Sequence, residues 1–264
     1  MPEGHTIHRL ARVLRARLAG QVLGASSPQG RFAAGAARLD GRVLDRVDAH
    51  GKHLFLGFDE QWVHIHLGLF GRVTVAAGPA PEPRGAVRLR LVGDDAFVDL
   101  RGPTACQLID DADKQSLHSR LGADPLRRDA DPGRAYERMR RRRLPLGAIL
   151  LDQSVVAGVG NVYRAELLYR AALSPYREAR RLDEHEWVGL WDDTVRQLRA
   201  GARAGRIVTT EREHRERSTG PARRMDAHYV YKRVDMPCRR CGAAVAAGDL
   251  AARTIFWCPT CQSS

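Results

Sequence analysis

The segment Leu150–Glu166, LLDQSVVAGVGNVYRAE, is where two helical runs of the sequence meet. Glycine adopts backbone conformations that other residues avoid, so Gly158 and Gly160 predict a very tight turn between the runs. Asn161 is expected to cap the helix that follows. The first backbone N–H groups of such a helix point away from it and suit a phosphate group. An ordinary helical hairpin without a ligand fits this segment equally well.

Helical sequence continues on both sides of this turn, to about residue 202. Asp183 and Glu186 have the spacing of a capping box at the start of the last long helix. The following residues, 203–230, are polar and rich in arginine, and Ser218–Pro221 interrupts them with the sequence STGP. This composition predicts a mobile loop.

Four of the five cysteines form two C-x2-C pairs near the end of the chain. Sixteen residues separate the pairs, which is within the spacing of a four-thiolate zinc site. The predicted ligands are Cys238, Cys241, Cys258 and Cys261, with a short hairpin between the two turns. Two disulfides or a redox pair are the alternatives, and disulfides are disfavoured because no secretion signal precedes the chain.

The N-terminal part combines one helix with many short strands. In residues 7–18 the apolar positions Ile7, Leu10, Ala11, Leu14 and Leu18 fall on one helical face. From Val22 to about Asp110 the sequence changes to short runs rich in valine and leucine, and VGDDAFV has the character of a hairpin. This pattern predicts an α+β fold in which one helix accompanies an antiparallel β-sandwich or barrel.

The charge of the chain indicates a polyanionic partner. Lys+Arg 43 against Asp+Glu 31 gives a net charge of +12, which favours nucleic acid, although a basic protein without such a partner remains an alternative. The sequence has neither a signal peptide nor an apolar run long enough for a membrane span, so we expect a cytoplasmic protein without a membrane partner. Only three of the basic residues are lysines. Because lysine releases its proton far more readily than arginine, Lys52 is a candidate for proton chemistry.

Four separated stretches of the sequence together resemble one known family. They are MPEG at the start, GKHLF around Lys52, LLDQSVVAGVGNVYRAE around Asn161, and ARTIFWCPTCQ at the end. In this order they resemble the formamidopyrimidine-DNA glycosylase/endonuclease VIII family of base-excision repair enzymes. The resemblance implies an N-terminal β-sandwich that begins with a helix, then a helix–two-turn–helix unit and a zinc hairpin.

We therefore expect four regions along the chain. They are a catalytic β-sandwich domain at 1–120, a hinge at 121–135, a helix–two-turn–helix domain with the mobile Arg-rich loop at 136–230, and a zinc-finger hairpin at 231–264.

The resemblance also implies a mechanism and its residues. The initiator methionine is removed, and the secondary amine of Pro2 attacks the sugar of a damaged nucleotide to form an imine. A terminal α-amine has a pKa of about 8, so it is substantially unprotonated near neutral pH. Glu3 would move protons to and from the sugar. Lys52 would act at a phosphate or sugar oxygen, and Asn161 and Arg253 would clamp phosphates around the extruded nucleotide, with Arg253 counted among the catalytic residues.

The expected partner is thus damaged DNA, bound by a monomer. The expected cofactor is one structural zinc ion, since four thiolates leave no open position on the metal. No catalytic metal or organic cofactor is expected.

Pro103, which departs from the family pattern, and the PEG start favour the endonuclease VIII branch, which acts mainly on oxidised pyrimidines. A second departure, Thr6, has a separate consequence. Thr6 stands where many members carry a glutamate, which puts a base-handling role of that carboxylate in doubt. The segment DLRGPTACQL keeps Arg101, a candidate DNA contact, but has Pro103 where the other branch has a wedge aromatic. Leu69 and Phe70 are candidates to fill the gap left by a flipped base, and the alternative is that both are core residues at a strand end.

Two other functions remain open from the residues alone. His64 and His66 share one strand face, a spacing that can bind a metal, so a metal-dependent hydrolase with a zinc ribbon is one alternative. A non-catalytic zinc-ribbon DNA-binding protein is the other. It accounts for the charge but gives no role to Pro2, Glu3 or Lys52.

Overall fold

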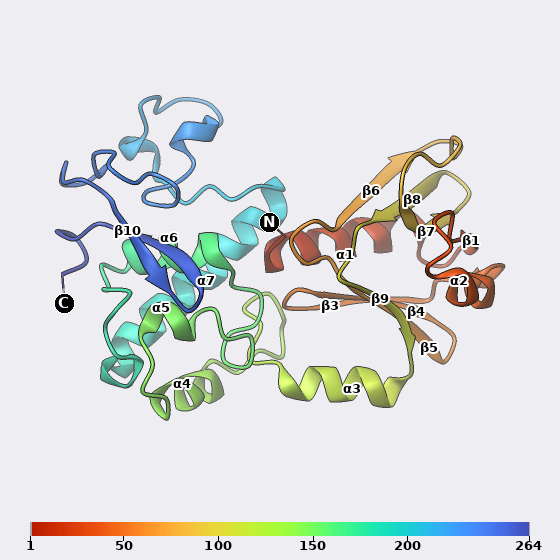
Figure 1. Cartoon of the computed structure of the whole chain (residues 1–264), viewed down its shortest axis with the longest axis horizontal. Coiled ribbons are helices and arrows are strands. Elements are labelled where there is room, and N and C mark those ends of the chain that lie inside the picture. Colours follow the sequence, from red (N-terminus) through yellow and green to blue (C-terminus); the bar gives the residue numbers. More distant parts are fainter. Residues whose placement is uncertain (1, 264) are drawn as a thin grey trace. The chain divides into compact units, whose positions relative to one another are not determined.

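The computed structural model describes residues 2–263, and it divides between Arg120 and Leu121 into two compact units (Figure 1). The predicted removal of Met1 therefore lies outside the described residues. No helix among residues 2–263 has the length and apolar character needed to cross a membrane. Each unit is built around its own hydrophobic core.

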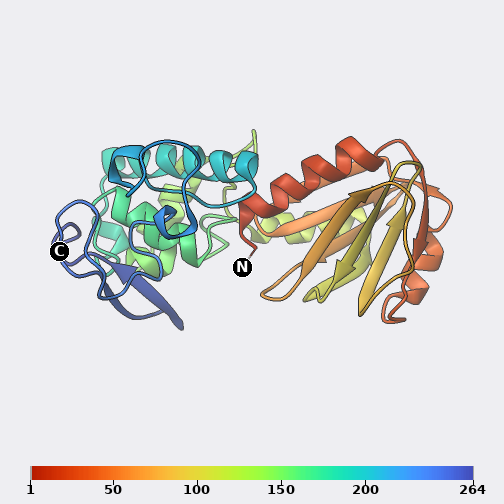
Figure 2. The same cartoon turned by 90° about the horizontal axis from the view of Figure 1, so that it is seen from above.

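The first unit consists of two antiparallel sheets and three helices (Figure 2). The five-stranded sheet has the order β2-β1-β7-β8-β6, and the four-stranded sheet has the order β3-β4-β5-β9. The elements are α1 (Gly4–Leu18), β1 (Val22–Ser26), α2 (Ala33–Leu39), β2 (Arg42–Val43), β3 (Arg46–His50), β4 (His53–Phe58), β5 (Gln61–His66), β6 (Arg72–Ala77), β7 (Val87–Val92), β8 (Ala96–Arg101), β9 (Ala105–Ile109) and α3 (Asp111–Arg120). The predicted α+β class is confirmed.

Helix α1 fills the space between the sheets with the predicted apolar face. Ile7, Ala11, Leu14 and Leu18 are buried, and they pack in the same core as Leu54 and Leu56 of β4 and Leu89 and Leu91 of β7. Fully burying one such side chain contributes about 1.5–3 kcal/mol. The N-terminal segment of the chain is therefore anchored through the core of this unit. The predicted VGDDAFV hairpin is also confirmed, since Gly93 N–H donates to the Ala96 carbonyl over 2.9 Å.

Helices α2 and α3 were not predicted from the sequence. Helix α2 is only seven residues long, and the apolar periodicity of such a short helix is weak. Helix α3 has no buried residue, although its half-buried Leu117 packs against Phe55, Trp62 and Ile109. Figure 1 shows α1 above and α3 below the four-stranded sheet, so this sheet is covered on both faces.

The second unit contains the helices and the cysteine module. Its elements are α4 (Pro132–Arg140), α5 (Leu146–Ile149), α6 (Asn161–Arg170), η1 (Ala179–Arg181), α7 (Glu184–Ala204), η2 (Arg212–His214), η3 (Arg224–Asp226), β10 (Ala246–Leu250) and β11 (Arg253–Trp257). The predicted capping box of α7 is confirmed: the side chain of Asp183 accepts from Glu186 N–H and that of Glu186 accepts from Asp183 N–H. Gly158 has a φ of +95°, which explains the need for glycine before α6.

The Arg-rich segment 203–230 has little regular structure beyond the end of α7 and two short 3₁₀ turns, yet it is anchored to α6. Buried Thr209 and the backbone N–H groups of Tyr229, Val230 and Tyr231 all donate to the carboxylate of Glu166, which is fully buried in α6. This carboxylate thereby fixes both ends of the segment. The mobility of the residues between them stays a prediction, as does the hinge at 121–135, whose last residues begin α4.

The β10–β11 hairpin turns through an unusual pair of residues. Ala251 and Ala252 both have a φ of +55°, where a side chain meets the backbone and only glycine or asparagine is common. The hairpin approaches α5 at Gly147, where an added Cβ would lie 2.6 Å from the Leu250 side chain. The turn is strained in itself and is held by its surroundings.

We expect Ala252→Gly to raise the free energy of unfolding of the second unit by about 1 kcal/mol, because it removes the left-handed strain. Chemical denaturation followed by tryptophan fluorescence measures this change, because three of the four tryptophans, Trp187, Trp191 and Trp257, lie in the second unit. The matched control is Ala247→Gly at an exposed position of β10, which should lower stability by about 0.5–1 kcal/mol. If Ala252→Gly and Ala247→Gly changed the free energy of unfolding equally, the turn would not be strained.

Candidate functional site

The proposed nucleophile lies at the start of α1. Pro2 is half-buried and directly precedes Glu3, which is the N-cap residue of the helix and is fully buried. The carbonyl of Glu3 accepts from Thr6 N–H over 2.9 Å and from Ile7 N–H over 3.4 Å. The backbone next to Pro2 is thus held by the first turn of a helix whose apolar face is in the core.

Lys52 lies in the two-residue turn that joins β3 to β4, and a histidine secures this turn. His66, the last residue of β5, makes a hydrogen bond from its Nδ1 to the Lys52 carbonyl over 3.1 Å. Burial lowers the pKa of His66, so the neutral ring with a proton on Nδ1 is the donor. The sequence singled out both residues but gave no reason to connect them.

Five histidines gather near this turn, around the outer face of the four-stranded sheet. His53 stacks on His66 and on His64 with ring centroids 4.8 Å and 5.1 Å apart, and its Nδ1 lies 2.8 Å from His64 Nε2. His50 and His118 complete the group at 4.9 Å from each other. Burial and the neighbouring imidazoles lower the pKa of His53 to about 3 and that of His64 to about 4, so both rings are neutral at physiological pH.

This histidine group does not have the geometry of a metal site. Within residues 2–263, only the four cysteines and the set Glu211, Glu213 and His214 place three or more potential ligand atoms within 4.8 Å of one another. His64 and His66 do share a strand face, as predicted, but His64 contacts His53 and His66 bonds to a backbone carbonyl. The contacts of His64 and His66 therefore give the metal-dependent hydrolase alternative no support.

Leu69 and Phe70 are exposed in a tight turn between β5 and β6, with 52% and 88% of their surfaces accessible. Gly71 N–H donates to the Leu67 carbonyl over 2.9 Å, and a Cβ at Gly68 or Gly71 would collide with Thr104 or the Leu67 backbone. The turn can close this tightly only with glycine at both positions. The alternative that both side chains are core residues is therefore wrong.

Arg101, at the end of β8, and Pro103, in the loop after it, are both held within the first unit. The guanidinium of Arg101 donates to the Arg84 carbonyl and to Asp99, over 3.1 Å and 2.9 Å from Nη2. It is held within its own unit, and a DNA contact of Arg101 stays a prediction. Pro103 is buried in the short loop between β8 and β9 and does not project as a wedge.

Asn161 is the first residue of α6, and the prediction that it caps this helix is wrong. The N-cap is Gly160, which offers no side chain. The amide of Asn161 points instead to the β10–β11 hairpin, where its Nδ2 donates to the Thr254 carbonyl over 3.0 Å. Asn161 therefore bonds to the residue next to Arg253, the exposed first residue of β11.

One residue that the sequence did not reveal connects these two. Arg164, one turn after Asn161, is fully buried and donates to the Asn161 side chain and to the carbonyls of Arg253 and Thr254. Arg164 lies three residues after Asn161 on a predicted helix, and this spacing alone could have indicated that the two side chains are neighbours.

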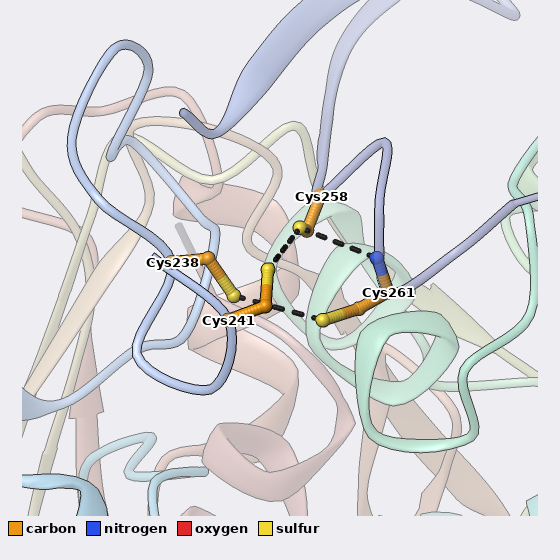
Figure 3. Close-up of side chains that lie close together, drawn as sticks. All are labelled: Cys238, Cys241, Cys258 and Cys261. Carbon is orange, nitrogen blue, oxygen red and sulfur yellow. Dashed lines mark hydrogen bonds between the residues drawn. The ribbon is translucent and has the colours of Figure 1, made fainter. Parts of the chain in front are cut away.

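The four cysteines converge on one point (Figure 3). Cys238 Sγ lies 3.9 Å from Cys261 Sγ, and Cys241 Sγ lies 3.5 Å from Cys258 Sγ. Four thiolates bound tetrahedrally to zinc at about 2.3 Å would lie about 3.8 Å apart, so the cluster fits one structural zinc ion. The sulfurs are much farther apart than the roughly 2.05 Å of a disulfide bond.

Their electrostatic environment also favours a bound cation. Burial raises the pKa of Cys258 and Cys261, so these thiols ionise near neutral pH only beside a cation. Against the opposing effect of burial, hydrogen bonds from the Tyr169 hydroxyl and from backbone N–H groups lower the pKa of Cys238 to about 6. Tyr169 Oη lies 3.0 Å from Cys238 Sγ and orients this ligand, a role that the sequence did not predict.

Comparison with known proteins agrees with this geometry. Residues 1–106 match the formamidopyrimidine-DNA glycosylase N-terminal domain, and residues 121–213 match the H2TH domain of the same glycosylase. The chain belongs to the formamidopyrimidine-DNA glycosylase/endonuclease VIII family. Among its curated relatives is endonuclease 8 1 of Mycobacterium tuberculosis, which is 47% identical over 268 residues that cover 100% of both chains.

Solved structures of this family have the same fold. The MutM (Fpg) protein of Thermus thermophilus is 30% identical, with a TM-score of 0.79 over 100% of this chain and 99% of that one. The Fpg of Lactococcus lactis, in complex with DNA that contains an abasic site, has a TM-score of 0.81 at 23% identity over 99% of this chain and 100% of that one. The helix–two-turn–helix fold and the C-terminal cysteine hairpin predicted from the sequence are thereby confirmed.

For the cysteine cluster we expect one zinc ion per chain, and Cys258→Ser should release it. Loss of the metal should unfold the β10–β11 hairpin and weaken DNA binding, because such a small module depends on its ion for folding. Metal analysis and DNA titration measure both effects, while the first unit should keep its own unfolding transition. Cys106→Ser, in the other unit, is the matched control and should retain zinc. Freshly purified protein without zinc would contradict this prediction.

The histidine group predicts how stability depends on pH. The folded chain keeps His53 and His64 neutral down to about pH 4, whereas the unfolded chain binds protons near the reference pKa of about 6.5. The unfolded state therefore binds more protons between these values, and stability should fall as pH decreases from about 6.5 to 4.

His64→Gln should reduce this dependence by about one proton, measured as the slope of the unfolding free energy of the first unit against pH. His185→Gln, at an exposed position of α7, should leave the slope unchanged. An equal slope in wild type and His64→Gln would show that His64 protonates normally in the folded protein.

Proposed function

We propose that this chain removes oxidised bases from DNA, mainly pyrimidines, through a covalent imine between Pro2 and the sugar of the damaged nucleotide. The chain is a DNA glycosylase and AP lyase of base-excision repair, as its full-length homology to an endonuclease 8 indicates. The observation that carries the finer proposal is the anchored chain start, where Pro2 precedes a buried glutamate and a helix packed into the core.

The reaction follows from the chemistry of a terminal proline. With Met1 removed, the Pro2 nitrogen is a secondary amine whose lone pair attacks C1′, and the bond to the base breaks with its electrons leaving on the base. The base takes up a proton, and the attached amine gives up its own. The C1′–O4′ bond then breaks, O4′ takes up a proton, and the opened sugar and Pro2 share an iminium. This cation acidifies the C2′ proton, so its removal expels the 3′ phosphate by β-elimination. A further δ-elimination expels the 5′ phosphate, and hydrolysis of the imine then returns the amine.

Glu3 and Lys52 would supply the proton transfers. Glu3 is adjacent to the nucleophile and buried, so water competes little with the substrate for its carboxylate. Lys52 is presented by a turn that His66 secures through its backbone carbonyl. A lysine in a fixed turn can act as a cation towards a phosphate and as a proton donor to a sugar oxygen.

The second unit would hold the DNA backbone. Arg253 is exposed at the hairpin turn, and Asn161 lies beside it through its bond to Thr254. A net charge of +12 adds long-range attraction to phosphates. The zinc ion would supply no reactive group, because its four thiolates complete the coordination, and the cysteines would serve to keep the hairpin folded.

The preference for oxidised pyrimidines rests on the turn between β5 and β6. An extruded nucleotide leaves a gap in the base stack, and unstacking costs a few kcal/mol that an inserted side chain offsets. Exposed Leu69 and Phe70 are suited to this insertion, whereas buried Pro103 is not.

The first test is the state of the amine. A chain that carries an uncleavable N-terminal extension should form no borohydride-trapped adduct with abasic DNA and should not cut it, because the Pro2 nitrogen is then a tertiary amide without a basic lone pair. Folding, zinc content and DNA binding should persist, and a C-terminal tag is the matched control. Strand cleavage at the normal rate by the extended protein would refute Pro2 as the nucleophile.

The second test concerns the lesion. Leu69→Ala and Phe70→Ala should slow release of 5-hydroxyuracil from duplex DNA by about tenfold or more, equal to roughly 1.4 kcal/mol, and should slow it much less from single strands. Val43→Ala, at an exposed position of β2 in the same unit, controls for the loss of an apolar surface side chain. Faster release of 8-oxoguanine opposite cytosine than of 5-hydroxyuracil by the wild type would overturn the pyrimidine preference.

A further inference from the structure

We propose that Arg164 is a positioning residue that sets the two DNA-clamp residues, Asn161 and Arg253, in a fixed relation to each other. The proposal deepens the proposed function and rests on its assignment of these two residues to the DNA backbone. It gives Arg164 no contact with the substrate and assigns its effect to the bonds that it makes within the second unit.

The guanidinium of Arg164 joins three separate parts of the chain. From Nη1 it donates to the carbonyls of Gly147 in α5 and Leu250 in β10, each over 3.1 Å. From Nη2 it donates to Asn161 Oδ1 over 2.6 Å and to the carbonyls of Arg253 and Thr254, each over 3.3 Å. The side chain is fully buried, so water cannot replace these donors without opening the core.

The bond to Asn161 determines which way its amide faces. Because Oδ1 accepts from Arg164, the nitrogen must be on the other side, where it donates to the Thr254 carbonyl over 3.0 Å. An amide nitrogen carries two hydrogens, and the second is the donor that a DNA phosphate would take. Without Arg164, the amide could rotate and turn its oxygen towards the phosphate. The negatively charged phosphate would repel that oxygen, which has no hydrogen to donate.

The bonds to the hairpin fix the place of Arg253. Arg164 binds the carbonyls of Leu250 and Arg253, which flank the two-residue turn on either side. Between them, Ala251 and Ala252 are both left-handed. Strained backbone of this kind persists only where its surroundings hold it, and Arg164 supplies donors at both ends of the strained pair. The same side chain thus holds the turn that presents Arg253.

This function needs the shape of the guanidinium and not only its charge. Arginine presents five donors in a rigid planar fork, whereas lysine has one nitrogen with three donors. The acceptors of Arg164 come from both sides of a hairpin and from two helices, and one ammonium nitrogen cannot reach them all. Arg164→Lys therefore separates geometry from charge.

The experiment is a titration of the full-length, zinc-loaded chain with a duplex that contains a stable abasic-site analogue, over a series of salt concentrations. We expect Arg164→Lys to bind at least about tenfold more weakly, as for the loss of a hydrogen bond to a charged group. The slope of log K against log salt should decrease in magnitude by about 0.9, since of the two clamp residues only Arg253 carries a charge that neutralises a phosphate. The matched control is Arg170→Lys in the same helix, which loses a guanidinium bound to Asp193 and should keep the wild-type slope.

A double-mutant cycle then tests the route of the effect. In the background Asn161→Ala/Arg253→Ala, Arg164→Lys should weaken binding by less than about twofold, because the residues through which it acts are gone. At saturating DNA, the rate of borohydride trapping by Arg164→Lys should stay near that of the wild type, which separates positioning of the DNA from chemistry. Wild-type binding by Arg164→Lys, or an undiminished effect in the double background, would overturn the proposal.

Two further outcomes are informative. If Arg164→Lys loses zinc or does not fold, the comparison is repeated in a chain that carries Ala251→Asn and Ala252→Gly. These two residues suit the turn. In that background the turn forms without Arg164, so the DNA affinity that Arg164→Lys still removes should come from the Asn161 contact alone. If Arg164→Lys removes no affinity there, the role of the amide is refuted. If the wild type binds but forms no adduct, the imine mechanism is wrong, whereas the binding comparison still decides the role of Arg164.

Discussion

The proposed mechanism needs an amine that is held in a fixed position, and the burial of α1 provides this support. The first residues of a protein usually lack a defined position unless a packed element follows them closely. Here the helix begins at Gly4, and Ile7, Ala11, Leu14 and Leu18 are buried between the sheets. With only Glu3 between Pro2 and this helix, the secondary amine of the proposed mechanism would have little freedom relative to the sandwich. In the proposed mechanism, folding would therefore meet the entropy of ordering the Pro2 nucleophile, and each substrate would not have to meet it again.

The other catalytic candidates of the first unit depend on the same kind of support. The turn with Lys52 is bonded to His66, which is followed directly by the turn that exposes Leu69 and Phe70. Neutral, closely stacked imidazoles lie next to the Lys52 turn, and their burial keeps them from charging at physiological pH. In the second unit, α6 provides the equivalent support: Glu166 holds the segment that leads to the cysteine module, and Arg164 holds the hairpin that the cysteines close.

Much of this could be predicted from the sequence because the signals were local. The apolar face of α1, the capping box at Asp183, the cysteine spacing and the hairpin between the cysteine pairs depend on residues close in sequence, and all are confirmed. Elements set by tertiary contact were missed: α2 is too short for a clear period, and α3 contributes only half-buried Leu117 to a cluster of Phe55, Trp62 and Ile109. Asn161 was misjudged for the same reason, since its partner Thr254 lies 93 residues away. Arg164 resembles any helical arginine until its acceptors in β10 and β11 are known.

The central claim is that the Pro2 nitrogen forms the covalent bond to DNA, and peptide mapping of the trapped complex tests it most directly. The unextended chain would be reduced with borohydride on an abasic oligonucleotide in excess EDTA, digested, and analysed by tandem mass spectrometry. The account predicts that the deoxyribose remnant is attached to a peptide that begins at Pro2 and lacks Met1. Attachment to the peptide that contains Lys52, or cleavage of the DNA with no adduct on any peptide, would contradict it.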